Sequence, residues 1–165
     1  PWSDGLIDYL KKIKDDKFIL LPEDYIIRSF VDTEKIKEAE KLCSGDVGCV
    51  RLNEPDKYYK YALDSGIRGY PVIKRYPLNK PYSMSMQAAV WQKQYLLDIL
   101  REGEDAWQAE IIGSKRLAKM GDKWKVLWPS SAAMDYQAGG LLVKGKPRIE
   151  VMKWMFNEFI QEIGK

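Results

Sequence analysis

Two adjacent carboxylates follow a short apolar run near the start of the sequence. Glu23 and Asp24 come just after residues 18–21, four apolar residues in succession. Because such a run leaves no polar face, it predicts a strand buried on both sides, in the interior of a parallel or mixed sheet. The carboxyl ends of such strands commonly bind ligands. We therefore expect the two acids to face a cleft and to meet a divalent cation or a sugar hydroxyl; the alternative is a solvated loop.

The absence of histidine limits the chemistry that remains. It excludes Ser-His-Asp and Cys-His catalysis and histidine zinc sites. Catalysis would then depend on carboxylates, lysine, tyrosine or a metal held by oxygen ligands. The two cysteines, Cys43 and Cys49, are too few for a disulfide framework and lack metal-ligand spacing, which fits a reducing cytoplasm.

Length and charge indicate one globular domain over residues 1–165. The chain has 27 Lys and Arg against 24 Asp and Glu, and the two signs are interleaved. A nucleic-acid-binding protein would concentrate its positive charge. No apolar stretch approaches the roughly 20 residues that span a bilayer. We expect a cytoplasmic protein with no transmembrane segment and no nucleic-acid partner.

Apolar periodicity predicts helices that alternate with strands, which is typical of α/β proteins. We expect one helix after Ser3, and a second after Asp32 or Thr33 that precedes a strand at residues 47–52. The cleanest amphipathic pattern lies near residue 165, and we expect its apolar stripe to be core. The stripe comprises Met152, Met155, Phe156, Phe159, Ile160 and Ile163.

Two further segments carry side chains capable of chemistry. Residues 82–86 alternate with period two and then lead, at residues 87–91, into a predicted helix. Asp105 is placed to cap the next helix, which carries Trp107 and Glu110. Residues 53–81 are rich in tyrosine, proline and basic residues. We interpret them as a long loop that faces the substrate, or alternatively as a surface flap over the sheet edge.

Taken together, three segments resemble soluble glycosyltransferases of the GT-A fold, of the kind that act in bacterial polysaccharide and lipopolysaccharide synthesis. Residues 18–25 place Glu23 and Asp24 where these enzymes carry an acidic metal-binding motif, usually two aspartates around one residue. Residues 83–91, followed by 95–97, look like the strand-to-helix segment beneath the acceptor site. Residues 103–110 are similar to the acidic, Trp-containing segment that holds the catalytic base.

The resemblance implies a GT-A-like, Rossmann-like mixed sheet flanked by helices. It covers roughly residues 2–120. The strand and helix that bind the nucleotide in this family have no counterpart before Trp2, so the chain looks like the carboxyl-terminal two-thirds of the fold. We expect such a chain to expose a sheet edge and to self-associate.

The implied reaction transfers a sugar from a nucleotide-diphosphate donor to a glycan or lipid-linked acceptor with the help of Mg or Mn. The resemblance gives the cation to Asp24, with Glu23. It gives the role of general base to Asp105 or Glu110, the alternatives being a helix cap and a solvent-facing acid. The motif differs from the usual one because a glutamate directly precedes the aspartate, so Asp24 is the stronger candidate ligand.

Aromatic side chains suit the apolar faces of pyranose sugars. The resemblance places Trp107, Trp91 and Tyr25 at the substrate, although Trp91 is equally suited to the core. The rival hypothesis is a non-catalytic carbohydrate-binding or interaction module of the same fold.

Overall fold

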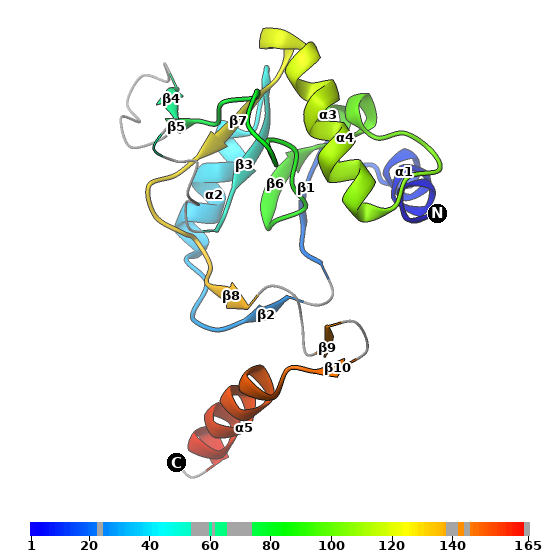
Figure 1. Ribbon diagram of the computed structural model, residues 1–165. Coiled ribbons are helices and arrows are strands. Elements are labelled where there is room, and N and C mark those ends of the chain that lie inside the picture. Colours follow the sequence, from blue (N-terminus) through cyan, green and yellow to red (C-terminus); the bar gives the residue numbers. More distant parts are fainter. Residues whose placement is uncertain are drawn as a thin grey trace.

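The chain alternates between helices and short strands and forms an α/β protein, as predicted (Figure 1). The computed structural model describes residues 1–22, 25–53, 60, 62–65, 74–137, 142–143 and 146–163. The helices are α1 (Trp2–Lys12), α2 (Thr33–Leu42), α3 (Lys93–Ile99), α4 (Ala106–Lys119) and α5 (Ile149–Ile163). None of the helices in this described part combines the length and the apolar character that a membrane-spanning segment needs.

Short strands build one mixed sheet and two separate strand pairs. The strands are β1 (Lys17–Leu20), β2 (Ile26–Ile27), β3 (Val47–Arg51), β4 (Leu63–Asp64), β5 (Lys74–Arg75), β6 (Ala89–Gln92), β7 (Lys125–Trp128), β8 (Tyr136–Gln137), β9 (Leu142–Val143) and β10 (Lys146–Pro147). The main sheet has the order β1-β6-β3-β7-β5-β4. β3 and β7 are parallel, and the other neighbouring pairs are antiparallel. β2 pairs with β8, and β9 with β10.

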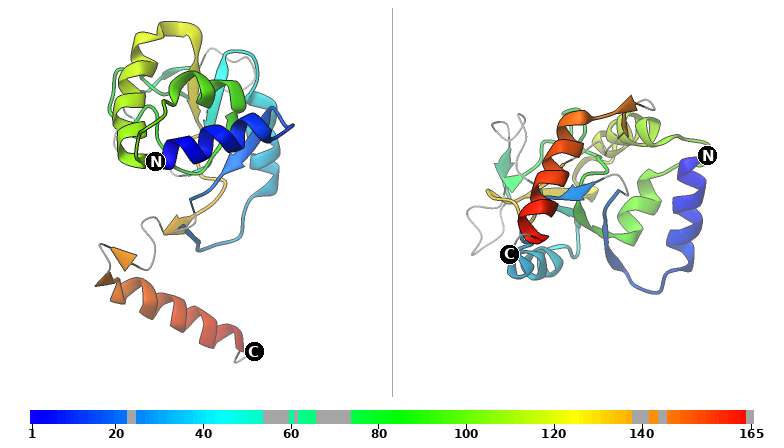
Figure 2. Two further views of the ribbon diagram at one scale, coloured as in Figure 1. Left: turned by 90° about the vertical axis from the view of Figure 1, so that its right-hand side faces the viewer. Right: turned by 90° about the horizontal axis from the view of Figure 1, so that it is seen from below.

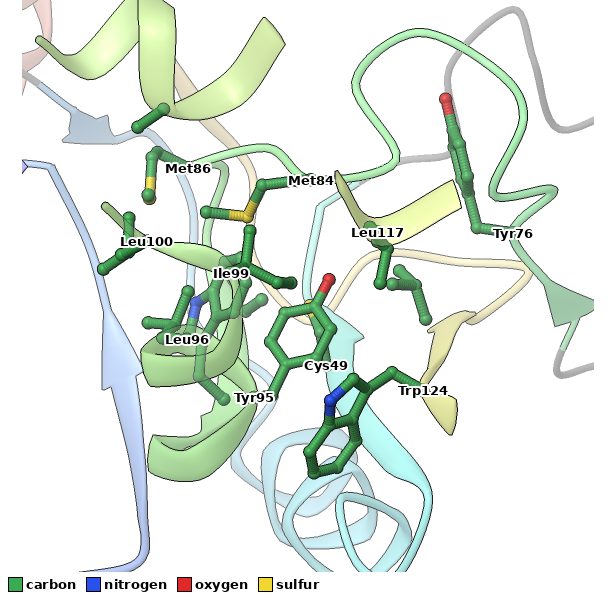
Figure 3. Close-up of a cluster of buried hydrophobic side chains, with 14 of the residues drawn as sticks. Cys49, Tyr76, Met84, Met86, Tyr95, Leu96, Ile99, Leu100, Leu117 and Trp124 are labelled. Carbon is green, nitrogen blue, oxygen red and sulfur yellow. The ribbon is translucent and has the colours of Figure 1, made fainter. Parts of the chain in front are cut away.

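Helices cover both faces of the main sheet (Figures 1 and 2). Cys49 of β3 pairs with Trp91 of β6, and Val50 pairs with Val90. The side chains of each pair point to the same face of the sheet, and the two pairs point to opposite faces. Cys49 and Trp91 join the core formed with α1, α3 and α4, part of which Figure 3 shows around Tyr95. Val50 and Val90 pack in the second core, against α2. The sheet is therefore buried between two helical layers, and the ends of its strands remain the place for a ligand site.

β1 lies at one edge of the main sheet, so the prediction of an interior strand was wrong. It pairs with β6. Phe18 and Leu20 pack against the core beneath α1 and α3, whereas Ile19 points to the α2 face and remains 46% exposed. Leu21, the last residue of the run, packs against the second core. The two helical layers thus partly bury three of the four apolar residues, so the run did not require a neighbouring strand on both sides.

α5 extends away from the main sheet, so the prediction of a core stripe was wrong for two of its members (Figures 1 and 2). Met152 is 46% exposed and Phe156 is 66% exposed. The helix contacts the rest of the protein through another side, where Val151 is buried and the ring of Trp154 lies 5.6 Å from the guanidinium carbon of Arg28. Periodicity identifies an apolar stripe but does not say which surface covers it. The side chains of residues 158–163 lie outside the described part.

Candidate functional site

The carboxyl ends of β1, β3 and β7 lie at the same end of the main sheet. Ala89, the first residue of β6, is opposite Leu20 of β1 and Arg51 of β3, the last residue of each strand. β7 runs parallel to β3 and ends beside it at Trp128. In α/β proteins this end of the sheet is the usual ligand side. It carries the candidate site.

Tyr25, Gln87 and Tyr136 form a hydrogen-bonded cluster at this end. Gln87 Nε2 donates to the Tyr25 hydroxyl at 2.6 Å, and the Tyr136 hydroxyl donates to Gln87 Oε1 at 2.6 Å. The two tyrosine rings stack with their centroids 4.6 Å apart. Burial raises the pKa of Tyr136 to about 12, so its hydroxyl stays protonated and remains a donor at neutral pH.

Short flanking elements position the two tyrosines. β2 and β8 pair antiparallel, with Ile27 opposite Tyr136, which brings the chain after Tyr25 alongside β8. The Tyr25 backbone N–H donates to the carbonyl of Pro22 at 3.1 Å. The described residues on either side of the predicted metal ligands are therefore tied to each other.

Glu110 of α4 holds the segment that precedes β6. Its Oε1 accepts from the Met86 backbone N–H at 2.6 Å and from the Ser85 hydroxyl at 3.0 Å. One turn further along α4, Ser114 exchanges two hydrogen bonds with the backbone of Met84, each of 3.1 Å. Glu110 is half-buried rather than solvent-facing, and among the described residues its Oε2 has no hydrogen-bond partner.

Asp105 is the N-cap of α4, as the alternative interpretation predicted. Its carboxylate accepts from the Gln108 backbone N–H at 2.7 Å, and Gln108 Oε1 accepts from the Asp105 N–H at 3.0 Å, which completes a capping box. Trp107, in the first turn of α4, is 69% exposed and open to a ligand. Trp91 is 1% exposed in the core, so it has no free face for a sugar in this structure.

The structure links two of the predicted site residues through one short segment. Gln87 bonds Tyr25, and its neighbour Met86 bonds Glu110. Asp105 and the exposed Trp107 lie at the amino-terminal end of α4, outside these hydrogen bonds. Gln87 and Tyr136 were not predicted, because isolated polar residues in irregular segments carry no periodic signal.

Glu23 and Asp24 lie outside the described residues, so their role as ligands of Mg or Mn stays a prediction. Within the described part of the chain, no group of three or more cysteine and carboxylate side chains is close enough to hold a metal ion.

Arg51 was not predicted as a site residue either, although it is a charged residue at the end of an otherwise apolar run. It is 3% exposed, and its guanidinium carbon lies 4.6 Å from the ring centroid of Tyr76 and 5.1 Å from that of Trp128. The guanidinium donates to the carbonyl of Tyr82. Ring faces and a carbonyl therefore surround this buried charge, which satisfies it through cation–π contact and hydrogen bonding.

Comparisons with known proteins add no family to this description. No protein-family model, curated protein or solved structure matches the chain. The function is therefore argued from the geometry of the site and the residues that form it.

Proposed function

We propose that the protein is a GT-A-type glycosyltransferase domain that transfers a sugar from a nucleotide-diphosphate donor to a hydroxyl of a glycan or lipid-linked acceptor. One observation supports this best. The three segments that resemble the family are hydrogen-bonded to one another, Gln87 to Tyr25 and Met86 to Glu110. Tyr25 directly follows Glu23 and Asp24 in the sequence. Residues distant in the sequence thus gather where α/β sheets bind ligands.

Glu110 is the better candidate for the general base. The acceptor hydroxyl loses a proton as its oxygen bonds to the sugar and the bond to the diphosphate breaks. Each carboxylate bonds described residues through one oxygen, Oδ1 of Asp105 and Oε1 of Glu110, and keeps a second oxygen that could take this proton. Asp105 is exposed at the end of α4, whereas Glu110 is half-buried and bonded to the segment that carries Gln87. The bonds from Met86 and Ser85 hold the carboxylate in place.

The other residues of the site would bind and orient the sugars. The amide of Gln87 and the hydroxyl of Tyr25 offer polar atoms, and the exposed ring of Trp107 suits a pyranose face. Mg or Mn at Glu23 and Asp24 would, when bound, neutralise the charge of the leaving diphosphate.

Calorimetry with UDP-glucose and GDP-mannose, with and without Mn²⁺, tests the proposal. Asp24→Asn should abolish any Mn²⁺ dependence of binding. Glu110→Gln should leave binding intact and lower turnover by a factor of about 100 or more. Glu102→Gln, at an exposed carboxylate in the loop before α4, is the matched control. Absence of both binding and turnover across a broader set of nucleotide sugars, also in a longer version of the protein that restores any sequence upstream of Pro1, would refute the transferase.

A non-catalytic carbohydrate-binding module is the second candidate. It is favoured by the hydrogen bonds that Asp105 and Glu110 already make within the protein, while Trp107 remains exposed. A module should bind glycans on an array without using nucleotide sugars. Trp107→Ala should weaken that binding, and Glu110→Gln should not.

A further inference from the structure

A pocket of about 370 Å³ lies between α4 and the loop of residues 78–82. It is a different place from the cluster around Gln87. Its volume is within the range of small-molecule sites. Much of its wall is apolar and comes from Leu78, Pro81, Ile111 and Ala118.

Buried side chains fix the loop side of this pocket. Tyr76, which is 0% exposed, donates from its hydroxyl to the carbonyl of Pro81 at 2.8 Å, and the buried Arg51 donates to the carbonyl of Tyr82. Tyr82 has a φ of 60°, a left-handed conformation that is costly for a residue other than glycine. Two core residues therefore hold a strained wall of the pocket in place.

The helix side of the pocket is equally well anchored. Ser114, which lines it, is hydrogen-bonded to both the N–H and the carbonyl of Met84. The adjacent Gly113 packs so closely that an added Cβ would lie 3.0 Å from Met84 Cγ and 3.1 Å from Ile99 Cγ2. The two walls are thus joined through residues 82–84, and the pocket exists without a ligand to order it.

The charges around the pocket select the kind of ligand. Lys80 and Lys115 both line it, and none of its described lining residues is acidic. The side chain of Tyr82 adds an aromatic surface that is 38% exposed. Apolar walls favour an apolar chain, and the ammonium group of Lys115, which has no ion-pair partner among the described residues, favours an anion over a neutral group.

We propose that this pocket binds an amphiphilic anion, an apolar chain that ends in a phosphate or a carboxylate. The chain would lie against Leu78, Ile111 and Ala118, with the anionic group at Lys115. The inference goes beyond the proposed transferase activity and does not depend on it, because it stands on the shape and charge of this pocket alone.

Calorimetric titration with decyl phosphate, below its micelle concentration, tests the pocket. We expect saturable binding of one molecule per chain. Decyl maltoside, with the same chain and a neutral head, should bind at least about tenfold more weakly. Lys115→Met should weaken decyl phosphate binding by about tenfold. Lys119→Met changes an exposed lysine on the same helix outside the pocket and should have no effect.

Ala118→Trp should abolish binding, because it fills the pocket. Ile111→Glu, at a 47% exposed position, should also weaken it and is a second variant if Ala118→Trp does not fold. Equal binding of both amphiphiles, no saturable binding, or binding that both variants leave unchanged would overturn the proposal.

One further measurement distinguishes a membrane lipid from a soluble ligand, and another distinguishes failure of this proposal from failure of the proposed transferase. Cosedimentation with phosphatidic acid vesicles that is lost in Lys115→Met would support a membrane lipid, whereas decyl phosphate binding without cosedimentation would support a soluble ligand. If the protein binds decyl phosphate but no nucleotide sugar, the result would support the proposal for this pocket and count against the proposed transferase activity.

Discussion

Arg116 and Glu104 form a bidentate ion pair that holds the loop before α4 against the helix. Arg116 Nη1 lies 2.8 Å from Oε1 and Nη2 lies 2.6 Å from Oε2 of Glu104. The two side chains are only 18% and 11% exposed. Arg116 Nε also donates to the carbonyl of Ile99 at 2.7 Å, and the Ser3 N–H donates to the carbonyl of Glu104 at 3.1 Å. The pair thus links α1, α3 and α4.

Breaking this pair should cost far more stability than breaking an exposed one. Arg116→Met leaves the Glu104 carboxylate buried without its partner and should lower the free energy of unfolding by about 3 kcal/mol or more. The Lys12–Asp8 pair has a distance of 2.6 Å but side chains that are 72% and 64% exposed, so Lys12→Met is the control. It should change the free energy of unfolding by less than about 1 kcal/mol. Urea denaturation measures both, and similar losses would contradict the argument.

Gly48 of β3 should be intolerant of any side chain. A Cβ at this position would lie 2.1 Å from Cδ2 of the buried Tyr95 ring. Gly48→Ala should therefore push α3 away from the sheet and destabilise the protein by about 3 kcal/mol or more. Gly5→Ala is the control, because a Cβ there meets nothing within 4 Å and α1 gains a better helix former. It should stabilise by about 0.5–1 kcal/mol in the same urea experiment.

The α/β class could be predicted because it depends on local periodicity, whereas strand order depends on pairing between distant segments. The apolar run at residues 18–20 is a strand, but the sequence does not say which partners flank it. Residues 87–91 were expected to lead into a helix; residues 89–92 instead form β6, and the helix α3 begins at Lys93. Val90 faces one core and Trp91 the other, and a short run buried on both sides has the same pattern in a strand and in a helix.

A site residue could be predicted only where its type suggests chemistry and a neighbouring feature of the sequence supports that role. Glu110 was found because it is an acid near a tryptophan on a predicted helix. Gln87 and Tyr136 make their contacts across the fold, so nothing local marks them. Arg51 had a usable signal, since a charge within an apolar strand must find a partner inside the protein.

The two cysteines should be unreactive in the folded protein. Burial raises the pKa of both thiols, that of Cys43 to about 12 from its ordinary 9.0. The folded state keeps these protons longer than the unfolded state, so stability should fall as the pH rises above 9.0. Ellman's reagent should label the native protein at pH 8 only as fast as it unfolds, and labelling in urea gives the reference rate. Rapid native labelling at either thiol would contradict the burial.

Asp98 should contribute stability that is lost in acid. Burial alone would raise its pKa, but hydrogen bonds from Lys123, Gln94 and Trp124 outweigh burial and lower it. Because the folded pKa lies below the ordinary 3.8, this contribution is complete well above that pH and is lost as the pH falls through the folded pKa. Asp98→Asn should therefore narrow the difference in stability between pH 7 and pH 3, followed by tryptophan fluorescence. Asp8→Asn, at an exposed carboxylate on α1, is the comparison variant.

Tyr136→Phe tests whether the cluster at the carboxyl ends of the strands serves a ligand or only the fold. The change keeps the ring stacked on Tyr25 and removes the hydroxyl that donates to Gln87, so Oε1 of that amide loses a donor. The free energy of unfolding should fall by about 1–2 kcal/mol. Tyr9→Phe, at a 59% exposed position, should have no measurable effect.

Binding separates the two roles of the Tyr136 hydroxyl. If the cluster orients a nucleotide sugar, Tyr136→Phe should also weaken binding of that ligand by at least about tenfold at a temperature where the variant remains fully folded. The reason is that the Gln87 amide is then held only by its bond to Tyr25. Thermal denaturation establishes that temperature and calorimetry gives the affinity. A loss of stability with unchanged affinity would mean that the hydroxyl serves the fold alone. The nucleotide sugar would then have to bind away from Gln87.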